Sequence, residues 1–225
     1  GADRVILASP VRSLLPLAEA IAGHVAPTAL IIDLGSVKAP LVEAVARGAL
    51  AKRFVGCHPL AGTEVTGPGA ADANLYAGKP CFVCPTVATD PAAVQAARRV
   101  WERIGATVIE LPAEAHDDFM AAASHLPHVA AFALALGLEP DAEMLVERTP
   151  PSYPPTSLRD SSRVAASNPA VWRDILLENR RQLLPRIRQM EASLVALRRA
   201  IEDGAADQLS DLLARGRKTR QRIVR

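Results

Sequence analysis

Residues 29–34 read ALIIDL, a mostly apolar run that Gly35 and Ser36 close. A short apolar run bounded by turn residues is typical of a strand that is buried on both faces of a sheet. Similar short runs occur at residues 4–8, 53–57, 81–84 and 107–111. Together these runs predict the strands of a sheet.

Helical patterns lie between most of these runs. Residues 11–24, 41–49 and 91–104 repeat their apolar side chains at helical spacing, and Gly105 suits a helix C-cap. Short buried strands that alternate with helices are typical of a mostly parallel sheet with helices on both faces. The first half of the chain therefore predicts an α/β domain.

The pattern changes after Pro112, because no further strand-like run follows and helical periodicity takes over. Residues 114–138 are apolar nearly all round, which predicts a central, buried helix. We therefore expect an α/β domain over residues 1–112 and an all-helical domain over residues 113–225.

The helical half also contains a strong break. Residues 150–155 read PPSYPP and predict an extended connector, because proline cannot continue a helix. Pro169 suits the first turn of the next helix, with Asn168 as an N-cap candidate. We expect this helix to run to about Glu202 and to bend at Pro185.

Composition narrows the class of protein. The chain has 225 residues, 49% of them hydrophobic, which excludes a disordered chain, and its three cysteines make no disulfide scaffold. The longest strongly apolar run, residues 129–138, is far shorter than the roughly 20 residues that span a bilayer. The first residues do not have the order of a secretory signal. We therefore expect a cytoplasmic protein with no membrane partner.

Positive charge is concentrated toward the C-terminal end. Residues 175–225 hold twelve Arg or Lys against six Asp or Glu (+6), and residues 1–174 hold fourteen against eighteen (−4). A basic helical tail raises nucleic acid as a partner. The basic residues of this tail alternate with acidic ones, however, and it has no aromatic residues. We therefore expect no nucleic-acid partner and interpret the tail as a solvated or subunit-facing surface.

Polar loops follow the ends of three predicted strands, at residues 9–12, 33–38 and 58–64. Ligands of parallel sheets bind beyond the carboxyl ends of the strands. Ser36, at a helix start, suits a polar or anionic ligand group, and the simpler alternative is a helix N-cap. His58 suits acid–base chemistry because its pKa lies near neutrality, and the alternative is a loop histidine with both ring nitrogens satisfied. The spacing alone leaves these alternatives open.

Residues 124–128 read SHLPH and place His125 and His128 on one helical face. Two histidines at this spacing could bind a metal, but a third ligand and an HExxH pattern are missing, so partnered core histidines are the default. The CxxC at residues 81–84 has no second pair and is interpreted as two small strand residues. Arg163 and a second arginine beside a serine pair could clamp a carboxylate.

In combination these segments resemble the prephenate dehydrogenase family. The matching segments occur in the family's order and spacing, at residues 9–12, 33–38, 53–64, 124–128 and 163–175, and the resemblance spans essentially the whole chain. It implies a partial Rossmann-like NAD(P)-binding domain over residues 1–112. It also implies an all-helical substrate-binding and dimerisation domain over residues 113–225, through which the protein forms a homodimer.

The resemblance implies an oxidoreductase that uses NAD, with NADP as the alternative. Its reaction is the oxidative decarboxylation of prephenate to 4-hydroxyphenylpyruvate in tyrosine biosynthesis, and no metal is implied. Arogenate is the alternative substrate, and a catalytically inactive dimerisation or binding module is the alternative class. A module would have little need for the whole set of polar residues in the matching segments, which favours the enzyme.

The resemblance also implies roles for particular residues. His58 takes the proton of the ring hydroxyl, and Ser36 holds His58 or that hydroxyl near the nicotinamide. His128 and Arg163 bind the carboxylate groups of the substrate. The other implied residues are Thr63, Glu64 and Trp172, which line the substrate pocket, and Ser9 and Pro10, which border the cofactor together with Ser36.

The chain departs from the family in two places. The G-x-G-x-x-G fingerprint and the acidic residue after the next strand are absent. We therefore expect these residues to lack the family's opening βαβ unit and to bind a dinucleotide poorly. Residues 155–158 read PTSL where the family has a glycine-rich turn, which affects the carboxylate end of the pocket.

Overall fold

The computed structural model describes residues 1–61, 69, 71–149 and 155–224. Its backbone forms two compact units, Gly1–Leu183 and Leu184–Arg225. The first unit contains an α/β layer structure and the first part of the helical half.

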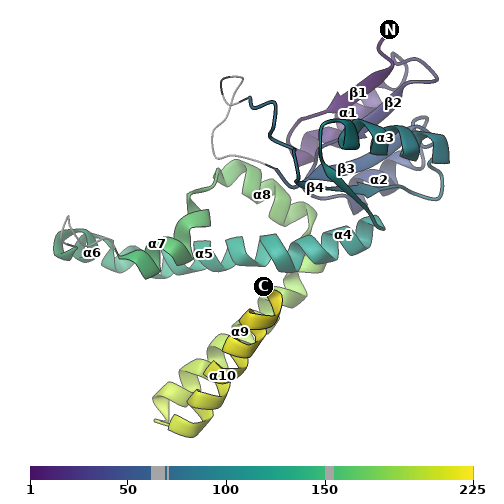
Figure 1. The fold of residues 1–225 in the computed structure, drawn as a ribbon. Helices are drawn as coiled ribbons and strands as arrows, with labels where there is room; N and C mark the ends of the chain where they lie inside the picture. The colour runs from purple at the N-terminus through teal and green to yellow at the C-terminus, as the bar shows by residue number, and fades with distance from the viewer. Residues whose placement is uncertain (62–68, 70, 150–154, 225) are drawn as a thin grey trace. The chain divides into compact units, whose positions relative to one another are not determined.

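The apolar runs of the sequence form a five-stranded mixed sheet (Figure 1). The strands, in their order across the sheet, are β1 (Arg4–Leu7), β2 (Leu30–Asp33), β3 (Phe54–Pro59), β4 (Pro80–Cys84) and β5 (Thr107–Glu110). Neighbouring strands are parallel except β3 and β4, which are antiparallel. The prediction of a Rossmann-like, mostly parallel sheet followed by helices is confirmed, with one antiparallel pair in the sheet.

Helices cover both faces of this sheet, as the strand pattern predicts. The helices are α1 (Val11–Ile21), α2 (Ala39–Val45) and α3 (Pro91–Arg103), and Gly105 follows α3 with a φ of 84°. Ile31 packs with α1 and α2, whereas its neighbour Ile32 packs with α3 on the other face. This alternation follows from the two-residue period of a strand.

The long apolar segment of the helical half forms a helical stretch of 25 residues, Ala113–Gly137. It consists of α4 (Ala113–Met120), a π-helical turn (Ala121–His125) and α5 (Leu126–Gly137). The expected central, buried helix is wrong for α5, because Ala131 is its only buried residue and Leu136 is 67% exposed. Among the described residues, this stretch is the one helix long and apolar enough to cross a membrane by length and composition, and 22% of its apolar window is buried.

Short helical segments continue the first unit. They are a 3-10 turn (Glu139–Asp141), α6 (Ala142–Arg148), α7 (Thr156–Ser162), a second 3-10 turn (Arg163–Ala166) and α8 (Pro169–Glu178). Asn168 caps α8, because its side chain accepts a hydrogen bond from the backbone N–H of Ala170. This cap agrees with the sequence prediction, whereas residues 150–154 of the predicted connector lie outside the described residues.

The expected single helix from Pro169 to Glu202 is wrong. Asn179 separates α8 from α9 (Arg180–Glu202), and Pro185 lies inside α9. The side chain of Asn179 is buried and hydrogen-bonds to the earlier helical stretch. These tertiary hydrogen bonds place the helix break at a polar residue that periodicity does not mark.

The second unit contains most of α9 together with α10 (Ala206–Ile223). Gly204, with a φ of 60°, lies between the two helices. Several large apolar side chains of this unit are exposed, among them Ile201 at 64% and Leu213 at 58%.

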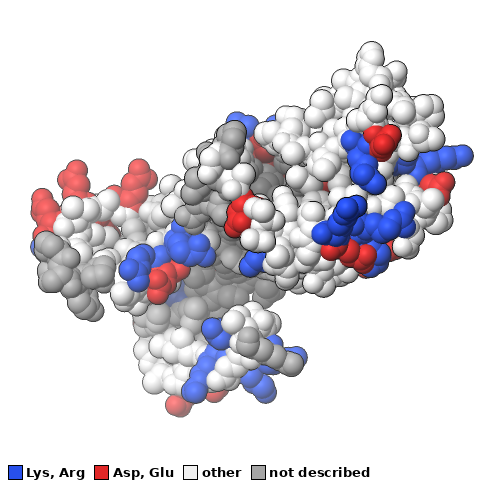
Figure 2. Space-filling view, turned by 45° about the horizontal axis from the view of Figure 1, so that its top comes forward, with Lys and Arg blue, Asp and Glu red and all other residues white. Residues whose placement is uncertain are grey.

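On the face of the protein shown in Figure 2, basic and acidic side chains lie beside one another over the α/β part.

Candidate active site

A cavity of about 350 Å³ lies beyond the carboxyl ends of β2 and β3, in the first unit. Ser36 and His58 line it from the sheet side, and His125 and Trp172 line it from the helical side. A cavity at this edge of a parallel sheet is where α/β proteins bind their ligands. Two distant parts of the sequence therefore contribute polar side chains to one site.

His58, at the end of β3, is the central titratable group of this cavity. Its side chain is 7% exposed, and its Nδ1 atom lies 2.8 Å from the Nε2 atom of His116. Burial lowers the pKa of His58 well below its ordinary value of 6.5, and electrostatic interactions with His116, Lys38 and His125 lower this pKa further. The ring is therefore neutral near pH 7, as a proton acceptor must be.

His116 connects His58 to a buried carboxylate. The Nδ1 atom of His116 lies 2.7 Å from Oδ1 of Asp117, and both residues are buried. The backbone N–H of Lys38 donates to Oδ1 of Asp117, and that of Ala39 donates to Oδ2, each over 2.8 Å. Asp117 of α4 therefore fixes the start of α2 and orients the ring of His116.

The alternative of Ser36 as a helix N-cap is wrong. Lys38 occupies the N-cap position of α2, and its side chain does not cap the helix. The carboxylate of Asp117 instead accepts hydrogen bonds from the backbone N–H groups of Lys38 and Ala39, at the start of α2. The Ser36 side chain lies instead among the residues that line the cavity. Its hydroxyl is thereby available to a ligand.

A buried ion pair holds the turn that carries Ser36. The ammonium group of Lys38 pairs with the carboxylate of Asp33 and donates to the carbonyl oxygen of Cys57 over 2.9 Å. The same carboxylate accepts the backbone N–H of Gly35. A Cβ atom at Gly35 would lie 2.6 Å from Cδ1 of Leu14 and 2.9 Å from Oδ2 of Asp33, so a larger residue there would displace these side chains. The polar loop after β2 is therefore rigidly placed.

His125 is the second buried histidine of the cavity. The side-chain nitrogen of Asn179 donates to the carbonyl oxygen of Asp117 over 2.8 Å and lies 2.9 Å from Nδ1 of His125. Because this nitrogen can only donate, Nδ1 of His125 accepts, and Nε2 has no partner among the described residues. Burial lowers the pKa of His125 to about 4, so the ring is neutral near pH 7.

His128 lies next to the cavity and contacts Trp172. The two rings stack with centroids 3.4 Å apart and planes 18° apart, and Nδ1 of His128 lies 2.9 Å from the carbonyl oxygen of Ser124. Burial lowers the pKa of His128, and the charge of Arg163 lowers it further. Arg163 is exposed and its charge acts on His128, and neither of these two residues is among those that line the cavity.

Two of the residues predicted to border the cofactor, Ser9 and Pro10, follow the end of β1. Ser9 has a buried hydroxyl with no partner among the described residues, and Pro10 is the N-cap of α1. Neither residue lines the 350 Å³ cavity. Thr63 and Glu64 lie outside the described residues.

The sequence analysis did not identify the polar residues that hydrogen-bond to His58 and His125, namely His116, Asp117 and Asn179. His116 and Asp117 are adjacent polar residues at the start of a long apolar stretch, and that position is the signal that could have marked them. Asn179 has no comparable signal, because a single asparagine between two helical patterns is ordinary. The described residues contain no group of three or more His, Cys, Asp or Glu side chains that could hold a metal ion.

The three cysteines are buried thiols without a disulfide. Burial raises the pKa of Cys57 and of Cys84 to about 12, and it raises the pKa of Cys81 as well. Thiols with raised pKa values are poor nucleophiles and poor metal ligands near pH 7. The interpretation of the CxxC as small strand residues agrees with this burial.

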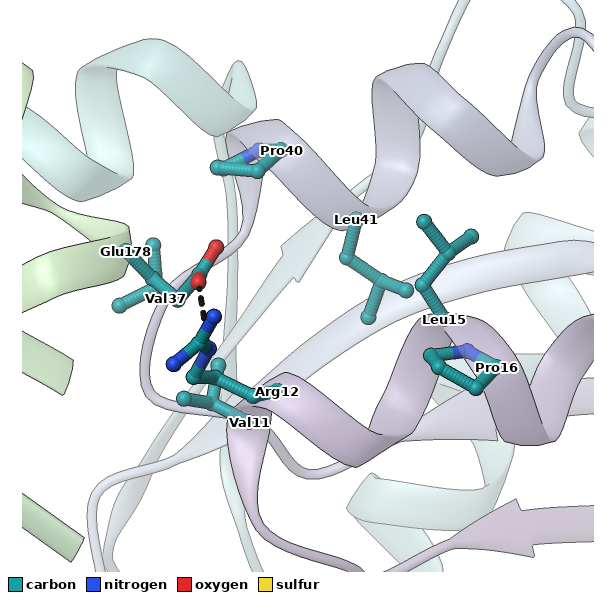
Figure 3. A pocket seen from close by; sticks show the side chains of 8 residues that line it. All are labelled: Val11, Arg12, Leu15, Pro16, Val37, Pro40, Leu41 and Glu178. Carbon is teal, nitrogen blue, oxygen red and sulfur yellow. Dashed lines mark ion pairs between the residues drawn. The ribbon is translucent and has the colours of Figure 1, made fainter. Parts of the chain in front are cut away.

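A second cavity, of about 260 Å³, lies between α1, α2 and α8 (Figure 3). Its walls are mostly apolar, and an ion pair crosses it between Nε of Arg12 and a carboxylate oxygen of Glu178, 3.3 Å apart. Arg12 belongs to α1 and Glu178 ends α8. This pair joins the α/β layer to α8, the helix that carries Trp172.

Two family models match the chain. The model described as the nucleotide-binding domain of prephenate dehydrogenase matches residues 1–110, and the model described as its dimerization domain matches residues 112–215. The cyclohexadienyl dehydrogenase of Zymomonas mobilis is 38% identical over 97% of this chain and 74% of its own length. The covered share falls to 56% of the length of another curated relative.

Solved structures agree with the family models. Prephenate dehydrogenase from Aquifex aeolicus, in complex with hydroxyphenyl propionate and NAD⁺, superposes with a TM-score of 0.83 at 37% identity, covering 98% of this chain and 76% of that one. The arogenate dehydrogenase of Synechocystis gives a TM-score of 0.81 at 30% identity, covering 99% and 80%. The chain belongs to the prephenate dehydrogenase family.

Proposed function

We propose that this protein catalyses the NAD-dependent oxidative decarboxylation of prephenate to 4-hydroxyphenylpyruvate. The observation that carries the proposal is a buried His58 that is neutral near pH 7 and lines a cavity beyond the sheet together with Ser36. The family models and the relative solved with NAD⁺ support the cofactor and the reaction class.

The residues present fit the nicotinamide end of a dinucleotide, and the glycine fingerprint that holds the pyrophosphate is not among them. Ser9 follows β1 and has a buried hydroxyl with no partner in the described part of the chain, and Ser36 follows β2 with its side chain at the cavity. Dinucleotides bind beyond the carboxyl ends of such strands, so Ser9, Pro10 and Ser36 would border the cofactor. When bound, NAD⁺ supplies a hydride acceptor for the substrate ring.

The side chains of the cavity would orient the substrate and move one proton. His58 accepts the proton of the ring hydroxyl while Ser36 holds the hydroxyl or the His58 ring in place. His128 and Arg163 bind carboxylate groups at the far end, next to Trp172. Loss of CO₂ makes the ring aromatic, so the protein mainly supplies orientation and a base. Thr63 and Glu64 complete the pocket lining in this proposal.

The proposal includes two domains, a homodimer and a cytoplasmic location. The two family models meet between residues 110 and 112, which supports domains over residues 1–112 and 113–225. The description of the second model as a dimerization domain supports a homodimer, and so do the exposed apolar side chains of α5 and α6, such as Leu136 and Val146. A homodimer would cover the apolar surface of the long helical stretch.

Arogenate is the second candidate substrate, because a relative of this fold is an arogenate dehydrogenase. The test is NADH formation by the natural full-length protein with prephenate and with arogenate, each with NAD⁺ and NADP⁺. We expect the highest kcat/KM with prephenate and NAD⁺. A higher kcat/KM with arogenate would reverse the substrate assignment, and no turnover with either substrate would show an inactive binding module.

A further inference from the structure

A line of three side chains runs from the cavity into the protein interior. His58 lines the cavity, His116 is fully buried behind it, and Asp117 is buried behind His116. The successive distances are 2.8 Å from His58 Nδ1 to His116 Nε2 and 2.7 Å from His116 Nδ1 to Asp117 Oδ1. Both are ordinary hydrogen-bond lengths, so Nδ1 of His58 and both ring nitrogens of His116 have defined partners.

The donors and acceptors in this line can be assigned from its inner end. Both oxygens of Asp117 face backbone N–H groups, from Lys38 and Ala39, which can only donate. The carboxylate is therefore the acceptor, and Nδ1 of His116 carries the proton. In a neutral ring Nε2 of His116 then has a lone pair and accepts from Nδ1 of His58.

We infer that His116 and Asp117 are positioning residues that fix the tautomer of His58, with its proton on Nδ1 and its lone pair on Nε2. This inference rests on the proposed function, in which His58 takes a proton from the substrate. The hydroxyl proton of the substrate passes to Nε2 of His58, and the imidazolium keeps its Nδ1–H bond to His116. Neither His116 nor Asp117 exchanges a proton in this step.

The surroundings of His116 suit a positioning role. Its ring meets Phe82 edge-to-face, with centroids 5.2 Å apart, and meets His58 edge-to-face at 5.0 Å. The ring of His116 is thus held by its contact with Phe82 and by its hydrogen bonds to His58 and Asp117. A histidine base in the wrong tautomer has its proton on the nitrogen that should accept one. In enzymes with a Ser-His-Asp triad, the aspartate prevents this by holding the histidine in the correct tautomer.

Two variants separate orientation from packing. His116→Phe keeps an aromatic ring among Phe82 and His58 but removes the acceptor for His58 Nδ1–H. His116→Gln keeps an acceptor oxygen near the position of Nε2. The matched control is His24→Phe, a change at an exposed histidine outside the site. Each is made in the natural full-length protein, labelled with ¹⁵N at its histidines.

The ¹⁵N spectrum of His58 at neutral pH tests the assignment directly. We expect a protonated Nδ1 and an unprotonated Nε2 in the wild-type protein and in the control, and a loss of this fixed pattern in His116→Phe. We expect kcat to fall by about 100-fold in His116→Phe, with KM changed by less than about threefold, and to recover substantially in His116→Gln.

Three results would overturn the inference. They are a wild-type His58 with its proton on Nε2, an unchanged kcat in His116→Phe, and equal losses in both variants with the tautomer of His58 unchanged, which would mean a packing role. The wild-type spectrum decides the tautomer even if a variant does not fold. If the wild-type protein oxidises neither prephenate nor arogenate, the proposed function fails, whereas the spectrum still decides the tautomer.

Discussion

His58 can accept a proton only if its ring is held in place, is neutral and faces the cavity. The hydrogen bond to His116 holds the ring, burial keeps it neutral, and the ring lines the cavity. His58→Asn should therefore lower kcat by about 100- to 10,000-fold, the range that a general base contributes, and change KM far less. Steady-state NADH formation measures both constants, with His24→Asn as the exposed control. Normal turnover in His58→Asn would show that His58 is not the base.

The lowered pKa of His58 has a consequence for the pH profile. A base is active when unprotonated, so activity is lost as pH falls through its pKa, and burial places that pKa well below 6.5. We expect kcat/KM to stay constant from neutral pH to below 6.5 and to fall only in more acidic buffer. An acid limb at or above 6.5 would mean that another group controls the reaction.

The sequence predicts the chemistry of single residues unevenly. Ser36 and His58 could be found because they follow apolar runs, and the ends of such runs become the ligand-binding edge of a sheet. His116 could not be given a role, since its partners lie 58 positions earlier in the chain and next to it on a buried helical face. Long-range hydrogen bonds between side chains leave no periodic signal.

At the scale of elements, one asparagine links α4, the π-helical turn and the break between α8 and α9. Asn179→Ala would leave Nδ1 of the buried His125 without its donor, and the carbonyl oxygen of Asp117 would keep only the backbone N–H of Ala121. A buried group that loses its partner costs about 1–3 kcal/mol, so we expect the free energy of unfolding to fall by about that amount. Urea unfolding measures it, and the exposed Asn74→Ala is the control. Equal stability of both variants would contradict this role.

The elements themselves were largely predictable because local patterns set them. Asn168 and Pro169 start α8 through backbone geometry and a side-chain cap, and Gly105 ends α3 with a positive φ. The break at Asn179 and the exposed face of α5 were not predictable, because the first depends on tertiary hydrogen bonds. The second depends on what packs against the helix, and an apolar pattern shows only that something does.

At the scale of the whole molecule, the exposed apolar side chains of α5 and α6 indicate an interaction surface. Leu136 of α5 is 67% exposed and Val146 of α6 is 77% exposed. Soluble proteins seldom leave large apolar patches exposed, and such patches mark interaction sites. A second copy of the chain is the partner that the dimerization family model favours.

Leu136→Arg tests this assembly because it places a charge on the exposed face of α5. If α5 lies in the dimer interface, burying an unpaired arginine there is unfavourable, and we expect the variant to shift from dimer to monomer at concentrations where the wild-type protein is dimeric. Light scattering after size-exclusion chromatography measures the mass. Val87→Arg, at a fully exposed residue before α3, is the control and should stay dimeric. A monomeric wild-type protein would refute the homodimer, whereas a dimeric Leu136→Arg would place the interface away from this face of α5.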